Sequence, residues 1–79
     1  MMKLNNKDPA RIQYLVEKIL EVCRDMQSAR FYARVARALP DDAIFQWLAE
    51  IKQDEGIRNR GAVFTCKAKE YAKRHGVPL

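Results

Sequence analysis

Apolar side chains recur at helical spacing in the first patterned stretch of the chain. Asp8 and Pro9 are typical of a helix start, because aspartate caps free backbone N–H groups and proline costs nothing at the first helical position. The apolar positions that follow cover about 160° of a helical wheel, and they are Ile12, Leu15, Val16, Ile19, Leu20, Val22, Cys23 and Met26. This pattern predicts a helix over about residues 9–26.

The apolar pattern changes phase after Met26. On the same helical wheel Phe31 and Val35 fall about half a turn away from the first stripe, so one straight helix would have apolar surfaces on opposite sides. We therefore expect a break, with Ser28 capping a second helix over about residues 29–39.

Proline, glycine and asparagine mark the ends of two further helices. Pro40 disfavours helical geometry at the residue before it, and the two aspartates after it suit the first turn of a helix over about residues 41–54. Gly56 ends that helix, and Asn59 caps the last one, which we expect over about residues 60–74.

These four helices define the predicted fold. Connections of a few residues favour antiparallel or angled neighbours, so the chain is predicted to be all-α, a compact single-domain four-helix bundle. We expect residues 8–79 to form this domain and the polar residues 1–7 to form a disordered tail.

Length and cysteine usage narrow the class of protein. A chain of 79 residues is near the size at which one core supplies only about 3–5 kcal/mol. Cys23 and Cys66 lack the dense spacing of a secreted disulfide framework, so both are expected to be free, buried thiols in a reducing cytosol. No apolar run is long enough for a signal peptide or a membrane span, which predicts a soluble, cytoplasmic protein without a membrane partner.

The residues that could support catalysis are few. His75 is the only histidine and lies in the last predicted helical turn, where a structural role is favoured. Asp41 and Asp42 are neighbours on a helix, point about 100° apart and suit a first turn without any catalytic role. We therefore predict a non-enzymatic protein with no cofactor and no metal site.

The net charge is concentrated at the C-terminal end. Residues 56–79 carry six Lys and Arg against one acid, whereas residues 1–55 carry nine of each, so the last 24 residues account for the total of +5. A basic block at one end favours a polyanionic partner such as the phosphate backbone of DNA or RNA.

The predicted fourth helix supplies most candidate phosphate-binding residues. Free N–H groups at its first turn, beside two arginines, form a candidate anion site made of Arg58, Asn59, Arg60 and Gly61. Along the helix the candidates are Lys67, Lys69, Lys73 and Arg74. The wheel places Lys69 and Lys73 on one side and Lys67 and Arg74 on another, an arrangement that suits phosphate contact more than base readout. The alternative, with equal weight, is a solvated helix whose cations balance acids such as Glu50, Asp54 and Glu55.

The predicted second helix adds a row of arginines. Arg30, Arg34 and Arg37 share the face opposite its apolar stripe and could hold phosphates. They could equally pair with acids of the first helix, such as Glu21 and Asp25. Whether this row adjoins Lys69 and Lys73 depends on how the helices pack.

The segment Gly56–Thr65 has the sequence GIRNRGAVFT. It resembles a helix-opening segment near the C-termini of bacterial, phage and plasmid replication accessory proteins, including DnaD-like primosome components. The resemblance covers about ten residues. It implies a DNA-binding accessory role in replication, with Arg58, Arg60, Lys67 and Lys69 as the residues to suspect.

Two functions of different classes follow from the sequence. The first is weak, sequence-independent nucleic-acid binding through the basic C-terminal helix. The second is a protein-interaction module that self-associates as a homodimer or docks an acidic protein partner, because the apolar stripes of the first and third helices are wide for so small a core.

Overall fold

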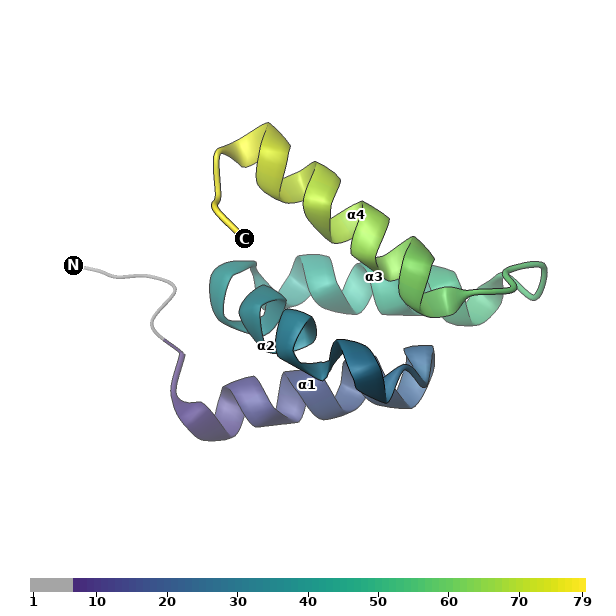
Figure 1. The fold of residues 1–79 in the computed structure, drawn as a ribbon, viewed down its shortest axis with the longest axis horizontal. Helices are drawn as coiled ribbons and strands as arrows, with labels where there is room; N and C mark the ends of the chain where they lie inside the picture. Colours follow the sequence, from purple (N-terminus) through teal and green to yellow (C-terminus); the bar gives the residue numbers. More distant parts are fainter. Residues whose placement is uncertain (1–6) are drawn as a thin grey trace.

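The computed structural model describes residues 7–79, which form four α-helices and no strand. The helices are α1 (Pro9–Cys23), α2 (Ala29–Ala38), α3 (Asp41–Gln53) and α4 (Arg60–His75), and a short 3-10 turn, η1 (Met26–Ser28), precedes α2 (Figure 1). The predicted all-α fold of four packed helices is thereby confirmed. Residues 1–6 of the predicted tail lie outside the described residues.

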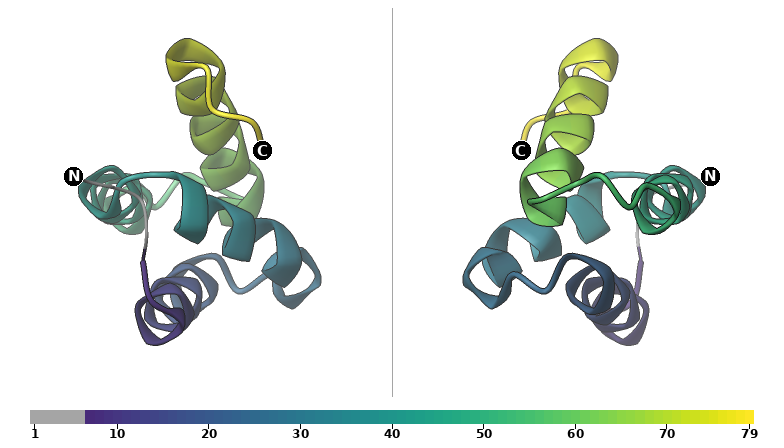
Figure 2. Two further views of the ribbon diagram at one scale, coloured as in Figure 1. Left: turned by 90° about the vertical axis from the view of Figure 1, so that its left-hand side faces the viewer. Right: turned by 90° about the vertical axis from the view of Figure 1, so that its right-hand side faces the viewer.

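The helices form a body of three elements with the fourth rising from it. Figure 2 shows α1 and α3 as neighbours on one side, α2 beside them on the other side, and α4 standing above, away from α1. The N-terminal half of α4 packs on the body, whereas its C-terminal half extends away and the residues after it turn back. The principal extents of this compact fold are 42 × 27 × 20 Å.

The core is an apolar layer to which all four helices contribute. Its fully buried large side chains are Leu15, Ile19, Tyr32, Val35, Leu39, Ile44, Ile51 and Phe64. Phe64 joins α4 to the body, because its ring meets Tyr32 of α2 and Trp47 of α3 edge-on at centroid distances of 5.5 and 5.9 Å. Aromatic pairs at such distances add about 0.5–1.5 kcal/mol to the free energy of burial. These two contacts set where α4 lies.

The predicted N-caps are confirmed at the starts of α1 and α4. Asp8 accepts a hydrogen bond from the backbone N–H of Arg11 at 2.8 Å, and Asn59 accepts one from Ala62 at 2.9 Å. Gly76 follows α4 in the left-handed conformation with φ 67°, which glycine adopts without steric cost. The boundaries of α2, α3 and α4 agree with the predictions within one residue.

The end of α1 was predicted three residues too late. Arg24 leaves the helix with φ 55° and ψ 37°, and its N–H bonds to the Leu20 carbonyl. A left-handed arginine costs roughly 1–2 kcal/mol, and tertiary contacts offset it: Arg60 Nη1 donates to the Val22 carbonyl at 3.2 Å. Met26 consequently lies outside the apolar stripe and is 72% exposed.

Ser28 occupies the position before α2, but its side chain caps nothing there. Its hydroxyl instead donates to Asp25 Oδ2 at 2.7 Å. The prediction of a serine side-chain cap was therefore wrong, because the carboxylate of Asp25, immediately before η1, is a stronger acceptor for the same hydroxyl.

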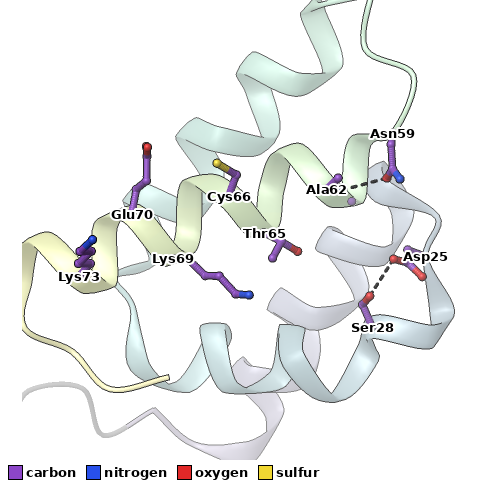
Figure 3. A pocket seen from close by; sticks show the side chains of 10 residues that line it. Asp25, Ser28, Asn59, Ala62, Thr65, Cys66, Lys69, Glu70 and Lys73 are labelled. Carbon is purple, nitrogen blue, oxygen red and sulfur yellow. Dashed lines mark hydrogen bonds between the residues drawn. The ribbon is translucent and has the colours of Figure 1, made fainter.

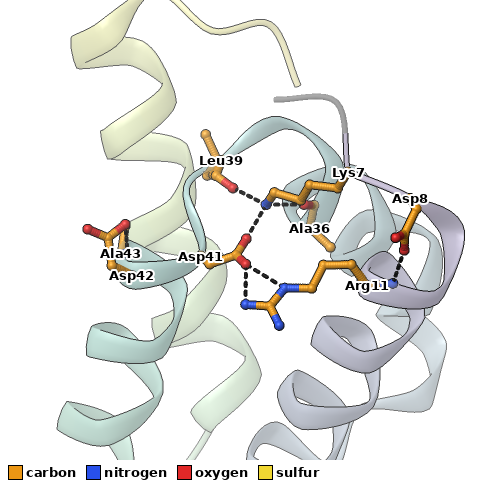
Figure 4. Close-up of polar contacts among 8 residues, drawn as sticks. All are labelled: Lys7, Asp8, Arg11, Ala36, Leu39, Asp41, Asp42 and Ala43. Atoms are coloured by element: carbon orange, nitrogen blue, oxygen red, sulfur yellow. Dashed lines mark hydrogen bonds and ion pairs between the residues drawn. The ribbon is translucent and has the colours of Figure 1, made fainter. Parts of the chain in front are cut away.

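Lys7, which the sequence placed in the polar tail, ties the start of the chain to the turn between α2 and α3. Its ammonium group donates to the carbonyls of Ala36 and Leu39 at 2.6 Å and lies 2.7 Å from Asp41 Oδ1 (Figure 4). Arg11 donates to the other carboxylate oxygen of Asp41. Burial opposes ionisation of Asp41, but the bonds from Lys7 and Arg11 outweigh it and lower its pKa.

We predict that Asp41→Asn lowers the free energy of unfolding at pH 7 by about 1 kcal/mol, the upper range for a partly exposed ion pair. The folded-state pKa of Asp41 lies below its unfolded value, so the stabilisation is present above about pH 4 and is lost as the pH falls through the folded pKa. Urea unfolding at pH 7 and at pH 2.5 checks this, with Asp54→Asn as the control. An equal difference at both pH values would contradict it.

Candidate nucleic-acid interface

The basic residues of α4 divide between two neighbouring helices. Lys67 faces α3, where its ammonium group lies 3.0 Å from Glu50 Oε1. The hydrogen bonds from Lys67 and from Gln46 lower the pKa of Glu50. Lys69 faces α2, where its ammonium group lies 5.8 Å from the centroid of the Phe31 ring. The predicted split is confirmed, and for Lys67 the structure realises the alternative of a cation balanced by an acid.

Packing places the arginine row of α2 on the side where Lys69 lies. Arg34, three residues after Phe31, reaches the segment that follows α4 and donates to the Leu79 carbonyl at 3.1 Å. The side chains of this row are exposed, and α2 contains no acidic residue. We call the set formed by Arg30, Arg34, Arg37, Lys69 and Lys73 the basic face.

The cations of the basic face are not used in ion pairs among the described residues, so they are available to a ligand. Among residues 7–79 no ion pair involves any of its five members. Glu21, one acid that the α2 arginines could have met, lies 3.6 Å from Lys18 instead. The other, Asp25, accepts from Ser28 and makes no such ion pair within the described part of the chain.

A second basic region surrounds the start of α4. Arg58 is exposed, and together with Arg24 and Arg60 it lines a polar hollow of about 710 Å³, which we call the arginine hollow. Sequence reasoning missed Arg24, because it reaches this place only through the left-handed end of α1. One N–H of Arg60 is already used on the Val22 carbonyl, so Arg24 and Arg58 are the more accessible cations.

The first turn of α4 already has an anion of this chain beside it. Asp25 lines the arginine hollow, and a Cβ built on Gly61 would lie 3.1 Å from Asp25 Oδ2. Because negative charge is favoured near a helix N-terminus, this carboxylate takes part of the role that the sequence assigned to a bound phosphate. The predicted anion site at Arg58, Asn59, Arg60 and Gly61 therefore contains one acid that the sequence pattern did not place there.

Gly61 is buried against a polar group of α2. The same Cβ would come within 2.8 Å of the Tyr32 hydroxyl, which is buried and has no hydrogen-bond partner among the described residues. Burial raises the pKa of Tyr32 to about 12, and burial also raises the pKa of the neighbouring Cys23 thiol to about 11. Only a residue without a side chain fits at this point of contact between α2 and α4.

The aromatic residues of α4 have structural roles. Phe64 is fully buried, and Tyr71 packs against Trp47 at a centroid distance of 5.6 Å. His75 stacks on Tyr71 at 4.1 Å with an interplanar angle of 30°. Because Phe64 is buried, its ring is not available to stack on a base.

The apolar stripes that suggested a protein-interaction module are mostly covered. Of the large hydrophobic residues in the described range, Tyr14 is 44% exposed and Met26 is 72% exposed. Tyr14 already meets Phe45 at a centroid distance of 6.4 Å and has Arg11 and Lys18 over its ring. The width of the stripes is thus explained largely by the core.

A metal centre and a membrane-spanning helix are two further possibilities for residues 7–79. No group of three or more His, Cys, Asp or Glu side chains there could hold a metal ion. No helix in the same range is both long and apolar enough to cross a membrane.

Comparison with protein-family models, with curated proteins and with solved structures gives no match for this chain. The resemblance of Gly56–Thr65 to replication accessory proteins stays a prediction.

We predict that Gly61→Ala lowers the free energy of unfolding by about 1–2 kcal/mol, because overpacking against the Tyr32 hydroxyl outweighs the gain in helix propensity. Tyr32→Phe removes the buried, unpartnered hydroxyl and should restore much of that loss in the double variant. Urea unfolding of the four-member cycle measures the coupling. Gly56→Ala, where the nearest atom would lie at 3.4 Å, is the control and should have little effect. Additive effects of the two changes would contradict the contact.

The two cysteines should differ in reactivity. Cys66 is exposed, contrary to the expectation of two buried thiols, because its position faces away from the core stripe of α4. Cys23 is buried, and burial raises its pKa to about 11, which suppresses the reactive thiolate. At pH 8 we expect the folded protein to react rapidly with one equivalent of Ellman's reagent, and the unfolded protein with two. Cys66→Ser should abolish the rapid phase, and a rapid phase that survives would contradict this assignment.

Proposed function

We propose that this chain binds the phosphate backbone of nucleic acid, largely independently of sequence, through the basic face of α2 and α4. The observation that carries the proposal is the juxtaposition of the α2 arginine row with Lys69, across the Phe31 contact. Five cations without an internal ion pair among residues 7–79 are an electrostatic footprint that phosphates could neutralise.

The chemistry of these side chains suits phosphate contact. Guanidinium groups present several donors in a fixed plane and can contact one phosphate through two N–H groups, whereas lysines act as mobile point charges. Arg24 and Arg58 in the arginine hollow extend this charge toward the start of α4. Lys67 is outside the proposed interface because Glu50 balances it.

The sequence resemblance suggests the biological process in which such binding would act. Replication accessory proteins carry a segment similar to Gly56–Thr65, and we include an accessory role in replication in the proposal. The binding itself does not depend on that assignment, since it rests on the charge of the basic face.

Fluorescence anisotropy with labelled DNA at several salt concentrations tests the proposal. We expect binding that weakens steeply with salt, and the double change Lys69→Gln with Lys73→Gln should reduce the slope of log affinity against log salt by roughly two, about one for each lost phosphate contact. The matched control, Lys67→Gln with Arg74→Gln, removes the same charge from the same helix and should change the slope less. Absence of binding at low salt, or equal effects of the two pairs, would overturn the proposal.

A further inference from the structure

A groove of about 570 Å³ runs between the start of α2 and one side of α4, and we call it the α2–α4 groove (Figure 3). Its volume lies within the range of sites that hold small ligands. Its two ends differ in chemistry, since Asp25, Ser28 and Asn59 line one end, whereas two lysines and one acid, Lys69, Lys73 and Glu70, line the other.

The end near Asp25 offers a free acceptor beside a free donor. Asp25 Oδ2 accepts from the Ser28 hydroxyl, and no hydrogen bond within residues 7–79 reaches its Oδ1. Asn59 Oδ1 accepts from the Ala62 N–H, which leaves the amide NH2 of Asn59 to donate elsewhere. Such a pair can meet a ligand edge that carries both a donor and an acceptor.

The wall between the two ends is small and mostly apolar. It is formed by α4, where Gly61, Ala62, Thr65 and Cys66 line the groove. The Tyr32 hydroxyl behind Gly61 leaves no space for a side chain at this position, so no side chain projects from it into the groove. A planar ring could lie along such a surface.

The lysine end of the groove lies about two helical turns of α4 beyond the Asp25 end. Lys69 follows Ala62 by seven positions, which corresponds to roughly 10 Å at the helical rise. This length is comparable to the separation between the amino group of a base and the phosphate of the same nucleotide.

We propose that the α2–α4 groove is a subsite for one unpaired nucleotide. Its base lies at the Asp25 end and donates an exocyclic amino hydrogen to Asp25 Oδ1, while its phosphate pairs with Lys69 and Lys73. This inference rests on the proposed function and adds to it a preference for bases that carry an exocyclic amino group. Adenine, cytosine and guanine carry an amino group, whereas thymine and uracil present carbonyl oxygens that the carboxylate repels.

Single strands should also bind better than duplex at this subsite. In a duplex the Watson–Crick edge of each base is engaged in pairing and the base is stacked in the helix, so the base could not enter the α2–α4 groove through that edge. Recognition of unpaired bases through that edge is the usual route to sequence preference on single strands.

Anisotropy titrations with short oligo-dC and oligo-dT of equal length test the inference at one low salt concentration. We expect oligo-dC to bind about fivefold more tightly, a modest effect for a hydrogen bond to a charged group. Asp25→Ala should abolish the difference, and Glu70→Ala, at the other acid that lines the groove, should preserve it. Lys69→Gln with Lys73→Gln should weaken both oligonucleotides by a similar factor.

A folding check with a second Asp25 variant, and an NMR titration, accompany the anisotropy measurements. Circular dichroism checks that Asp25→Ala folds, and Asp25→Asn, which retains the side-chain volume, should reduce the preference if the alanine variant does not fold. In amide NMR spectra, CMP should shift the Ala62 and Thr65 signals more than UMP does.

The outcomes separate the two proposals. Equal, salt-dependent binding of oligo-dC and oligo-dT would overturn the subsite and leave the phosphate-binding function standing. A preference that survives Asp25→Ala and Asp25→Asn would likewise overturn the role of Asp25. No binding of either oligonucleotide would overturn both proposals.

Discussion

The arrangement of this protein depends on the close contact between the first turn of α4 and the start of α2. Gly61 lies so near the Tyr32 hydroxyl that a single added carbon would be 2.8 Å away, and Phe64, one turn later, meets the Tyr32 ring edge-on. This contact sets the position of α4 from its N-terminal end. The basic face, the arginine hollow and the α2–α4 groove all follow from that position, because each includes residues on both sides of the contact.

The same contact determines which neighbouring helix each cation of α4 faces. Once Phe64 and Ala68 face the core, helical geometry sends Lys67 toward α3 and Lys69 toward α2. Glu50 of α3 then balances Lys67, whereas α2 meets Lys69 with an aromatic ring and adds three arginines. Asp25 is drawn to the start of α4 by the early end of α1. The α4 cations are thus divided, because Glu50 balances Lys67, whereas Lys69 lies beside the helix that carries three arginines.

Much of the fold could be predicted from the sequence because its helix signals are local. Asp8 with Pro9, Asn59 and Gly76 act on backbone groups within a few residues, and the phase change after Met26 is a property of the helical repeat. Two of the errors arose where distant residues intervene, whereas the Ser28 hydroxyl is engaged by its near neighbour Asp25. Arg24 leaves α1 early beside Arg60, which caps a carbonyl of that helix from 38 residues away, and Lys7 is held by carbonyls of α2 and the following turn.

The sequence by itself determined the four helices, their apolar faces, and the split of the α4 cations, since all of these depend on spacing along one helix. Only the tertiary structure decided which cations are paired, which acid lies beside the start of α4, and that Lys69 lies against Phe31 of the helix that carries the arginine row. The physical reason is that electrostatic neighbours on different helices are chosen by packing. Here the packing is fixed by a glycine and a buried aromatic pair, whose contact across the fold is not visible in the pattern of either helix alone.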